Sequence, residues 1–173
     1  PEGNPSARVV LLKGFDARGF VFYTNLQSRK AQELSAHGSA ALCFYWPGSA
    51  SSTAHEGAAA SLPARQVRIE GTVECVADAE ADAYFASRPR GAQIGAWASL
   101  QSEVLTSREE LEERVKDFEE EFSGSEVPRP QFWSGFRVVP QRIEFWQSRE
   151  DRLHDRAVYV REGAKWVKQL LYP

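Results

Sequence analysis

The sequence has little of what several classes of protein require. Among its 173 residues there are only two cysteines, Cys43 and Cys75, and three scattered histidines, so no structural zinc site is predicted. We interpret both cysteines as buried free thiols in apolar strands, as in a reducing compartment. No apolar run could span a bilayer, and no secretory signal begins the chain. We therefore expect a soluble, cytoplasmic protein; an organelle-targeting segment upstream of Pro1 would lie outside this sequence.

The sequence also lacks a large excess of charge of one sign. The formal net charge is -3 and the isoelectric point is near 5.7, which argues against broad nucleic-acid binding because such a protein needs a basic face. With 42% hydrophobic residues, the length suits one globular domain, residues 1–173, with its own core.

The hydrophobic pattern predicts many short strands. They are expected at residues 8–13, 20–25, 40–46, 66–76, 135–139, 142–147, 155–161 and 166–172. Between the third and fourth strands, residues 47–63 are rich in Gly, Ala and Ser, which predicts a flexible loop.

A few helices are expected among these strands. One covers residues 29–37, with Ser28 as N-cap and Gly38 as its stop, and another covers residues 78–87, with Asp78 as its cap. A third follows Ser107, whose spacing to Glu110 is that of a capping box. Because β-α-β alternation is absent, the order of elements predicts an antiparallel barrel of the α+β class, mainly β.

A cluster near the C-terminus points most directly to a binding site. Trp146, Arg152, His154 and Arg156 lie within eleven residues of one another. An arginine offers a planar fork of donors for phosphate or carboxylate, a histidine exchanges protons near neutral pH, and a tryptophan stacks on rings. This combination suggests a site for a flat anionic ligand. A hairpin whose solvent face is merely charged would also give this pattern, and the residues alone leave both interpretations open.

Four further segments carry polar residues that strands do not require. Arg8 and Lys13 bracket one expected strand, but five residues apart they point to opposite faces of it. Arg29 and Lys30 fall in the first turn of a helix, where backbone N–H groups attract anions, although surface pairs of this kind are common. Arg88 begins a segment rich in Pro and Gly, predicted to be a loop that could cradle a second phosphate. Gln101 and Ser102 are neutral hydrogen-bonding residues that are uninformative alone.

Taken in order, these segments resemble the pyridoxamine/pyridoxine 5'-phosphate oxidase family. The resemblance rests on RVVLLK at residues 8–13, FYTNLQSRKA at 22–31, RQVRIEG at 65–71, YFASRPRGAQIGAW at 84–97, QS at 101–102 and EFWQSREDRLHDR at 144–156. The last of these is highly specific. The resemblance implies an FMN-binding split barrel, a Greek-key antiparallel barrel with a few peripheral helices, that works as a homodimer with FMN at the interface.

The resemblance also implies roles for individual residues. Those assigned to the FMN cofactor are Arg8, Val9, Val10, Leu11, Leu12, Tyr23, Thr24, Arg29, Lys30, Gln66, Gln101, Ser102, Trp146 and Arg156. Those assigned to the substrate phosphate are Lys13, Tyr84 and Arg88. Arg152 and His154 are assigned to the substrate ring and the reacting carbon, and so to catalysis.

The implied reaction oxidises pyridoxamine or pyridoxine 5'-phosphate to pyridoxal 5'-phosphate, with O2 as acceptor and H2O2 as product. Two features depart from the family. The chain begins after the place of the family's first strand and N-terminal arm, and Ala92 stands where a serine usually helps to bind the substrate phosphate. These departures motivate an alternative, a split-barrel protein that binds flavin or pyridoxal 5'-phosphate without turnover. Another split-barrel flavin reductase is less well supported, since it would not require Arg152 and His154 at this spacing.

Overall fold

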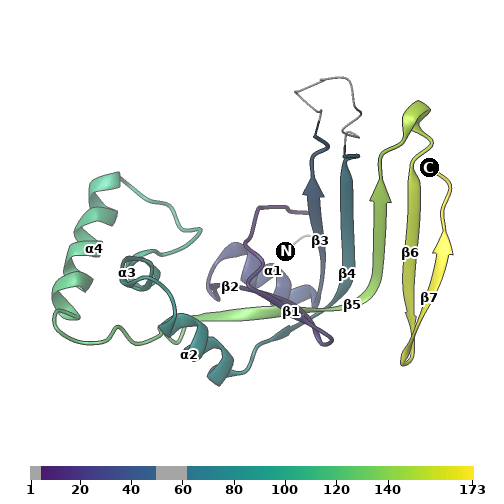
Figure 1. The fold of residues 1–173 in the computed structure, drawn as a ribbon. Helices are drawn as coiled ribbons and strands as arrows, with labels where there is room; N and C mark the ends of the chain where they lie inside the picture. Colours follow the sequence, from purple (N-terminus) through teal and green to yellow (C-terminus); the bar gives the residue numbers. More distant parts are fainter. Residues whose placement is uncertain (1–4, 50–61) are drawn as a thin grey trace. The chain divides into compact units, whose positions relative to one another are not determined.

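The computed structural model describes residues 5–49 and 62–173, which form two compact units. The first unit consists of Pro1–Gly38 and Val73–Arg137, and the second of Ser39–Thr72 and Val138–Pro173. Two long strands, β4 and β5, contribute residues to both (Figure 1). The central part of the expected loop at residues 47–63 lies outside the described residues, and the expectation of a single domain stays a prediction.

The first unit combines a short β-structure with four helices. Its elements are β1 (Gly14–Asp16), β2 (Gly19–Asn25), α1 (Arg29–His37), α2 (Asp78–Ala86), α3 (Arg90–Ala98), α4 (Arg108–Glu121) and the first part of β5 (Trp133–Gln147). Strands β1 and β2 form a tight antiparallel hairpin in which Asp16 is opposite Gly19. Strand β5 is the next neighbour of β2 in the sheet.

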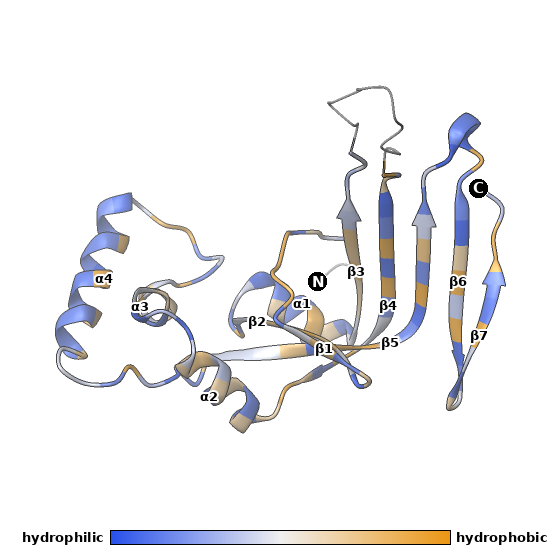
Figure 2. Cartoon of the chain, in the orientation of Figure 1, coloured by the Kyte–Doolittle hydropathy of each residue, from blue (hydrophilic) through white to orange (hydrophobic). Residues whose placement is uncertain are grey.

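An aromatic core holds the helices of this unit together. Phe85, Ile94, Phe122 and Trp133 are buried in one cluster. Trp97 of α3 lies with its ring centroid 5.5 Å from that of Phe122, at the end of α4. The apolar residues of α2, α3 and α4 therefore face a shared core, while the exposed side of α4 is rich in glutamate (Figure 2).

The second unit is an antiparallel sheet. It contains β3 (Ser39–Trp46), most of β4 (Arg65–Cys75), the second part of β5, the short 3-10 turn η1 (Glu150–Arg152), β6 (Asp155–Glu162) and β7 (Lys165–Leu170). The hydrogen-bonded order is β3-β4-β5-β6-β7. Polar and apolar residues alternate along its strands (Figure 2), as expected where successive side chains point to opposite faces.

Strand β5 is continuous through Pro140, where the sequence predicted two separate strands. Proline has no N–H for the ladder, so it ordinarily interrupts a central strand. The neighbouring strand β4 has a glycine, Gly71, beside Val139 and Pro140. A Cβ atom on Gly71 would lie 2.0 Å from the carbonyl oxygen of Val139 and 3.0 Å from Cα of Pro140. The absence of a side chain at Gly71 is what permits this close approach of the two backbones.

Most of the expected elements are confirmed. The helix α1 with its left-handed C-cap Gly38, the β3–β4 pair and the strands β2, β6 and β7 all form. The expected first hairpin forms with other bounds, because β1 lies at Gly14–Asp16, within the predicted turn. Ser107 accepts a hydrogen bond from the backbone N–H of Glu110, as the capping pattern predicted. Both cysteines are free, but the expectation that they are buried was wrong, because both are exposed.

Three local predictions were also wrong. Residues 8–13 belong to no strand, and the ladder begins only where Lys13 donates its N–H to the carbonyl of Val21. The helix α2 has Ala77 rather than Asp78 as its N-cap. The predicted loop after Arg88 is largely the helix α3, which Pro89 caps. Proline suits the start of a helix because its fixed φ is helical and its missing N–H is not needed there.

We predict that Gly71→Ala destabilises the protein strongly. The added methyl group would overlap the Val139 carbonyl, and the cost should be at least about 3 kcal/mol because backbone on both sides must move. The measurement is the free energy of unfolding from urea titration. Gly95→Ala is the matched control. It lies within α3 with open space around it, so it should be neutral or stabilise by up to about 1 kcal/mol. Equal effects of the two changes would contradict this account of β5.

Candidate functional site

In the first unit, a lysine lies at the centre of a polar cluster. The ammonium group of Lys30 donates to Oγ1 of Thr24 at 2.8 Å, to Oε1 of Gln101 at 2.7 Å and to Oγ of Ser28 at 3.3 Å. Thr24 also donates to Gln101 at 3.0 Å. Burial, with a smaller contribution from nearby Arg8, lowers the pKa of Lys30. The structure thus brings together three residues assigned to the cofactor from segments far apart in the sequence.

Two arginines of the same unit share one carboxylate. Glu33 accepts from Arg29 Nε at 2.8 Å, from Arg8 Nη2 at 3.1 Å and from the hydroxyl of Ser6. The Ser6 hydroxyl, together with the two guanidinium groups, lowers the pKa of Glu33 to about 2. Arg8, Arg29 and Lys30 therefore form a cationic group, and Glu33 neutralises part of its charge. Such a group suits an anion with several oxygen atoms.

A stack of aromatic rings carries the residues assigned to the substrate phosphate. The ring centroid of Tyr84 is 4.1 Å from that of Tyr23, which is itself 5.3 Å from that of Trp133. Lys13 places its ammonium group 5.9 Å from the Tyr84 ring centroid, and the Arg88 guanidinium lies 4.8 Å from that of Trp133. Lys13, Tyr84 and Arg88 are thus brought to one aromatic stack, although they are up to 75 residues apart in the chain.

Arg88 has an unusual environment within this stack. Its Nη1 atom is buried and has no hydrogen-bond partner among the described residues. Burial lowers the pKa of its guanidinium. A buried N–H group without a partner costs free energy, so an acceptor supplied by a ligand would be stabilising here.

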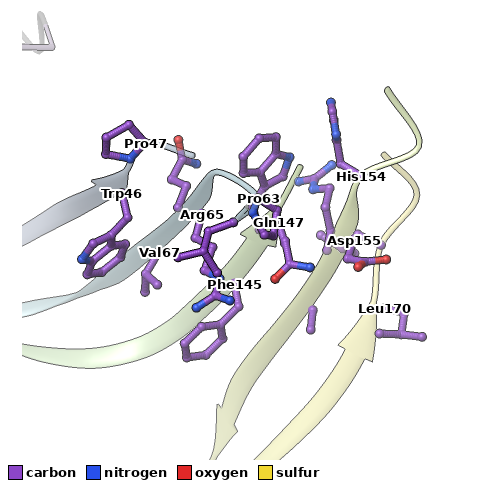
Figure 3. Close-up of a pocket in the computed structure, with 16 residues that line it drawn as sticks. Trp46, Pro47, Pro63, Arg65, Val67, Phe145, Gln147, His154, Asp155 and Leu170 are labelled. Atoms are coloured by element: carbon purple, nitrogen blue, oxygen red, sulfur yellow. The ribbon is translucent and has the colours of Figure 1, made fainter. Parts of the chain in front are cut away.

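The second unit contains an open cavity of about 810 Å³ at the end of its sheet. Three of the residues assigned to the cofactor, Gln66, Trp146 and Arg156, line it together with His154. Figure 3 shows Trp46 and Val67 on the side of β3 and β4, and His154 and Asp155 at the start of β6. The other lining residues are Pro47, Leu62, Pro63, Arg65, Phe145, Gln147, Ala157, Leu170 and Leu171.

The turn between β5 and β6 holds the residues assigned to catalysis. His154 lies against Trp146, with ring centroids 4.8 Å apart, and its Nδ1 accepts the backbone N–H of Arg149 at 3.1 Å. A neutral His154 ring therefore carries its proton on Nε2. Arg152 is exposed and has a φ of 60°, while the preceding Asp151 has a φ of 53°. Left-handed backbone at two successive non-glycine residues is strained, and such strain is concentrated at functional sites.

Not every assigned residue joins these clusters. Val9 is 94% exposed and Leu11 is 68% exposed, and neither they nor Val10 and Leu12 pack in a core of the described residues. Ser102 adopts a φ of 79° and lines a smaller hollow of about 220 Å³ beside Gln101. Within the described ranges, no group of three or more His, Cys, Asp or Glu side chains is placed to hold a metal ion.

The sequence analysis missed three residues that these clusters depend on. Glu33 binds two of the cationic residues, and its position four residues after Arg29 on a helix would have predicted an ion pair between them. Trp133 joins the stack of Tyr23 and Tyr84, which no local pattern indicates. Glu144 is buried and binds Arg156 at 2.8 Å.

Comparison with known proteins places the chain in a family. Residues 1–121 match the family described as pyridoxamine 5'-phosphate oxidase, and residues 133–173 match the pyridoxine 5'-phosphate oxidase C-terminal dimerisation region. The chain belongs to the pyridoxine/pyridoxamine 5'-phosphate oxidase family. It is 62% identical over 172 residues to the pyridoxine/pyridoxamine 5'-phosphate oxidase of Myxococcus xanthus strain DK1622, covering 99% of this chain and 77% of that protein.

Another oxidase and a solved structure are also similar to this chain over most of its length. The oxidase of Rubrobacter xylanophilus is 56% identical over 173 residues, covering 100% of this chain and 73% of that protein. The structure of PhzG from Burkholderia lata 383, in complex with tetrahydrophenazine-1-carboxylic acid, has a TM-score of 0.81 at 32% identity, over 97% of this chain and 75% of that one.

A more distant structure shows the same fold. It is a pyridoxamine 5'-phosphate oxidase-related, FMN binding protein from Nostoc punctiforme PCC 73102, with a TM-score of 0.71 at 16% identity, over 100% of this chain and 83% of that one. The expected split-barrel fold of the oxidase family is confirmed. The family's dimerisation region covers β5, β6 and β7. None of the helices in the described residues has both the length and the apolar character needed to cross a membrane.

We predict that Glu33 of this oxidase family member stabilises the fold in a pH-dependent way. Its pKa in the folded state, about 2, is below its ordinary value of 4.5, so its stabilising effect is present above about pH 4.5 and is lost as the pH falls toward 2. Glu33→Gln should therefore lower the free energy of unfolding at neutral pH, and its difference from the unaltered protein should shrink below pH 4.5.

The measurement is chemical denaturation at a series of pH values. Glu112→Gln is the matched control, because Glu112 has the same spacing from Arg108 on a helix but forms a single, more exposed pair. A difference for Glu33→Gln that stays constant from pH 7 to pH 3 would show that its contacts with Ser6, Arg8 and Arg29 do not contribute as inferred.

Proposed function

We propose that this protein uses FMN to oxidise pyridoxamine 5'-phosphate and pyridoxine 5'-phosphate to pyridoxal 5'-phosphate, with O2 as the electron acceptor. The observation that carries the proposal is the 62% identity with a pyridoxine/pyridoxamine 5'-phosphate oxidase over 99% of the chain. The match to the dimerisation region supports a homodimer. In this proposal FMN binds at the interface between the subunits.

The residues of the first unit fit a phosphorylated flavin. Arg8, Arg29 and Lys30 form a cationic group to which Glu33 supplies a carboxylate, so they retain positive charge for an anion. We assign the FMN phosphate to this group, with Thr24 and Gln101 holding Lys30 in place. These contacts bring a lysine and two arginines together in a chain whose formal net charge is -3.

The aromatic stack of the same unit fits a second, smaller phosphate. Nη1 of Arg88 is buried without a partner among the described residues, which supports a ligand acceptor at this place. Lys13 and Tyr84 would contribute a cation and a phenol hydroxyl beside it. We assign the 5'-phosphate of the vitamer to these three residues.

The residues of the second unit fit the ring systems. Trp146 offers an aromatic face, Arg156 a guanidinium and Gln66 an amide, all lining one cavity. When bound, FMN supplies the redox chemistry, and the protein supplies binding and orientation. Arg152 and His154 orient the substrate ring. The Nε2–H of a neutral His154 can donate a hydrogen bond to an oxygen or nitrogen of the substrate.

The overall reaction balances without a further oxidant. Pyridoxamine 5'-phosphate, O2 and water give pyridoxal 5'-phosphate, ammonia and H2O2, and two electrons pass from the carbon that bears the amine to O2. Pyridoxine 5'-phosphate and O2 give the same aldehyde and H2O2. The contribution of the chain is to hold the reacting carbon in position and exclude misplaced water, which is mainly a matter of orientation.

An absorption spectrum tests the proposal directly. The purified protein, reconstituted with FMN, should show the flavin bands, and adding pyridoxamine 5'-phosphate without oxygen should bleach them. Admitting O2 should restore the bands and release H2O2. A protein that takes up no FMN would refute the proposal. A protein that binds FMN but is neither bleached nor turns over would be the non-catalytic flavin-binding protein instead.

We predict that two arginine substitutions separate the substrate from the cofactor. Arg152→Ala should lower kcat/KM for pyridoxamine 5'-phosphate by about 10- to 100-fold, the loss of one charge-assisted hydrogen bond, and leave FMN content unchanged. Arg29→Ala should weaken FMN retention, because it removes one of the three cationic residues that we assign to the FMN phosphate. The measurements are steady-state kinetics at saturating FMN and flavin content after gel filtration. Unchanged FMN content and activity in both variants would refute these assignments.

A further inference from the structure

A buried glutamate lies on the face of the sheet that carries the assigned ring contacts. Along β5, Glu144 and Trp146 are two residues apart and so point to the same face. Arg156 of β6 is directly opposite Trp146, which places its side chain on that face as well. Glu144 is 2% exposed, although a carboxylate is rarely buried without partners.

Three arginines from three strands converge on this carboxylate. Its Oε1 accepts from Nε of Arg156 at 2.8 Å, and its Oε2 accepts from Nη2 of Arg68 at 3.2 Å and from Nη2 of Arg142 at 3.5 Å. The hydrogen bond from Arg156, with burial acting against it, leaves the pKa of Glu144 lowered. Glu144 is therefore charged at neutral pH and acts as the counter-ion of the group.

The contact at Nε determines how the Arg156 guanidinium is oriented. A guanidinium is planar, so fixing the direction of Nε–H also fixes the directions of its other donors. Nη1 of Arg156 donates to the carbonyl of Tyr172 at 3.0 Å, which holds the same plane from a second side. The Arg156 side chain remains 27% exposed and lines the cavity beside Trp146.

We propose that Glu144 is a positioning residue for the flavin, which holds Arg156 in the orientation in which it contacts the flavin ring. The inference rests on the proposed function, because it takes Arg156 as a contact of FMN. It goes further by identifying what prepares that contact. Without Glu144, only the hydrogen bond from Nη1 to the Tyr172 carbonyl holds the guanidinium among the contacts of the described residues, and Arg68 and Arg142 repel it.

A neighbouring acid provides a matched comparison. Glu70 lies on β4, two residues from Arg68, and accepts from Arg142 at 2.9 Å and from Arg68 at 3.3 Å. It belongs to the same charged network as Glu144, and in the described part of the chain it has no contact with Arg156. If the glutamates only balanced charge in the sheet, substituting either one should affect flavin binding equally. If Glu144 positions Arg156, only the substitution of Glu144 should weaken flavin binding.

The test compares flavin affinity in Glu144→Gln and Glu70→Gln. Dissociation constants for FMN and for riboflavin, which lacks the phosphate, are measured on the homodimeric apoprotein by quenching of flavin fluorescence. Glu144→Gln should weaken both flavins by the same factor, at least about 10-fold, because Arg156 contacts the ring. Glu70→Gln should stay within about 2-fold of the unaltered protein. Arg29→Ala should weaken FMN much more than riboflavin, which identifies the phosphate end.

A double-mutant cycle shows whether the effect passes through Arg156. In an Arg156→Ala background, Glu144→Gln should cause no further loss of flavin affinity. A further loss as large as in the unaltered protein would overturn the proposal, as would equal losses from Glu144→Gln and Glu70→Gln. If Glu144→Gln does not fold, Glu144→Asp keeps the buried charge but withdraws the carboxylate from Nε, and should weaken both flavins by about 3-fold or more.

Failure of the proposal can be told apart from failure of the proposed function. If the unaltered protein binds no flavin, the proposed function fails and the inference fails with it. If the unaltered protein binds FMN and Arg156→Ala weakens it, but both Glu144 variants bind as tightly as the unaltered protein, the proposed function stands and the role of Glu144 is refuted.

Discussion

Pairing of arginine with glutamate is the interaction on which both units depend. Glu33 binds Arg8 and Arg29, Glu144 binds Arg156, and the buried Arg137 of the first unit donates to Glu74 and Glu80. A protein that binds anionic ligands must hold several cations close together, and their mutual repulsion opposes folding. Carboxylates placed among the arginines reduce this repulsion and hold the guanidinium groups in fixed orientations before a ligand arrives.

The effect of such a pair on stability depends on whether both partners are present. A buried ion pair contributes little net stability over an apolar pair, but removing one partner leaves an uncompensated charge and is strongly destabilising. The side chain of Arg137 is only 6% exposed, so the loss of its partly exposed partners Glu74 and Glu80 would leave a buried charge without compensation. The same reasoning explains why the acidic residues of this chain are not simply a solvated surface. Part of the acidity serves to hold the cationic residues of the proposed site in place.

Local signals predicted those elements in which a short stretch of sequence determines the conformation. The left-handed cap at Gly38 and the capping pair of Ser107 and Glu110 were both recognised from a few neighbouring residues. Helix α3 was missed because Pro89, Gly91 and Gly95 are typical of a loop. The helix forms because Ile94 and Ala98 are buried in the tertiary core. Strand β5 was divided at Pro140 because the compensating Gly71 lies on another strand.

The sequence by itself determined the family, the antiparallel fold class and the identity of the residues proposed to bind ligands, because its motifs are specific and keep their order along the chain. Only the tertiary structure decided which of those residues meet. Lys30 joins Gln101 across 71 positions, Lys13 and Arg88 reach the aromatic stack that includes Trp133, and Glu144 supports Arg156 from a neighbouring strand. Contacts of this kind depend on strand register and on burial in a core, which no short segment of the chain specifies.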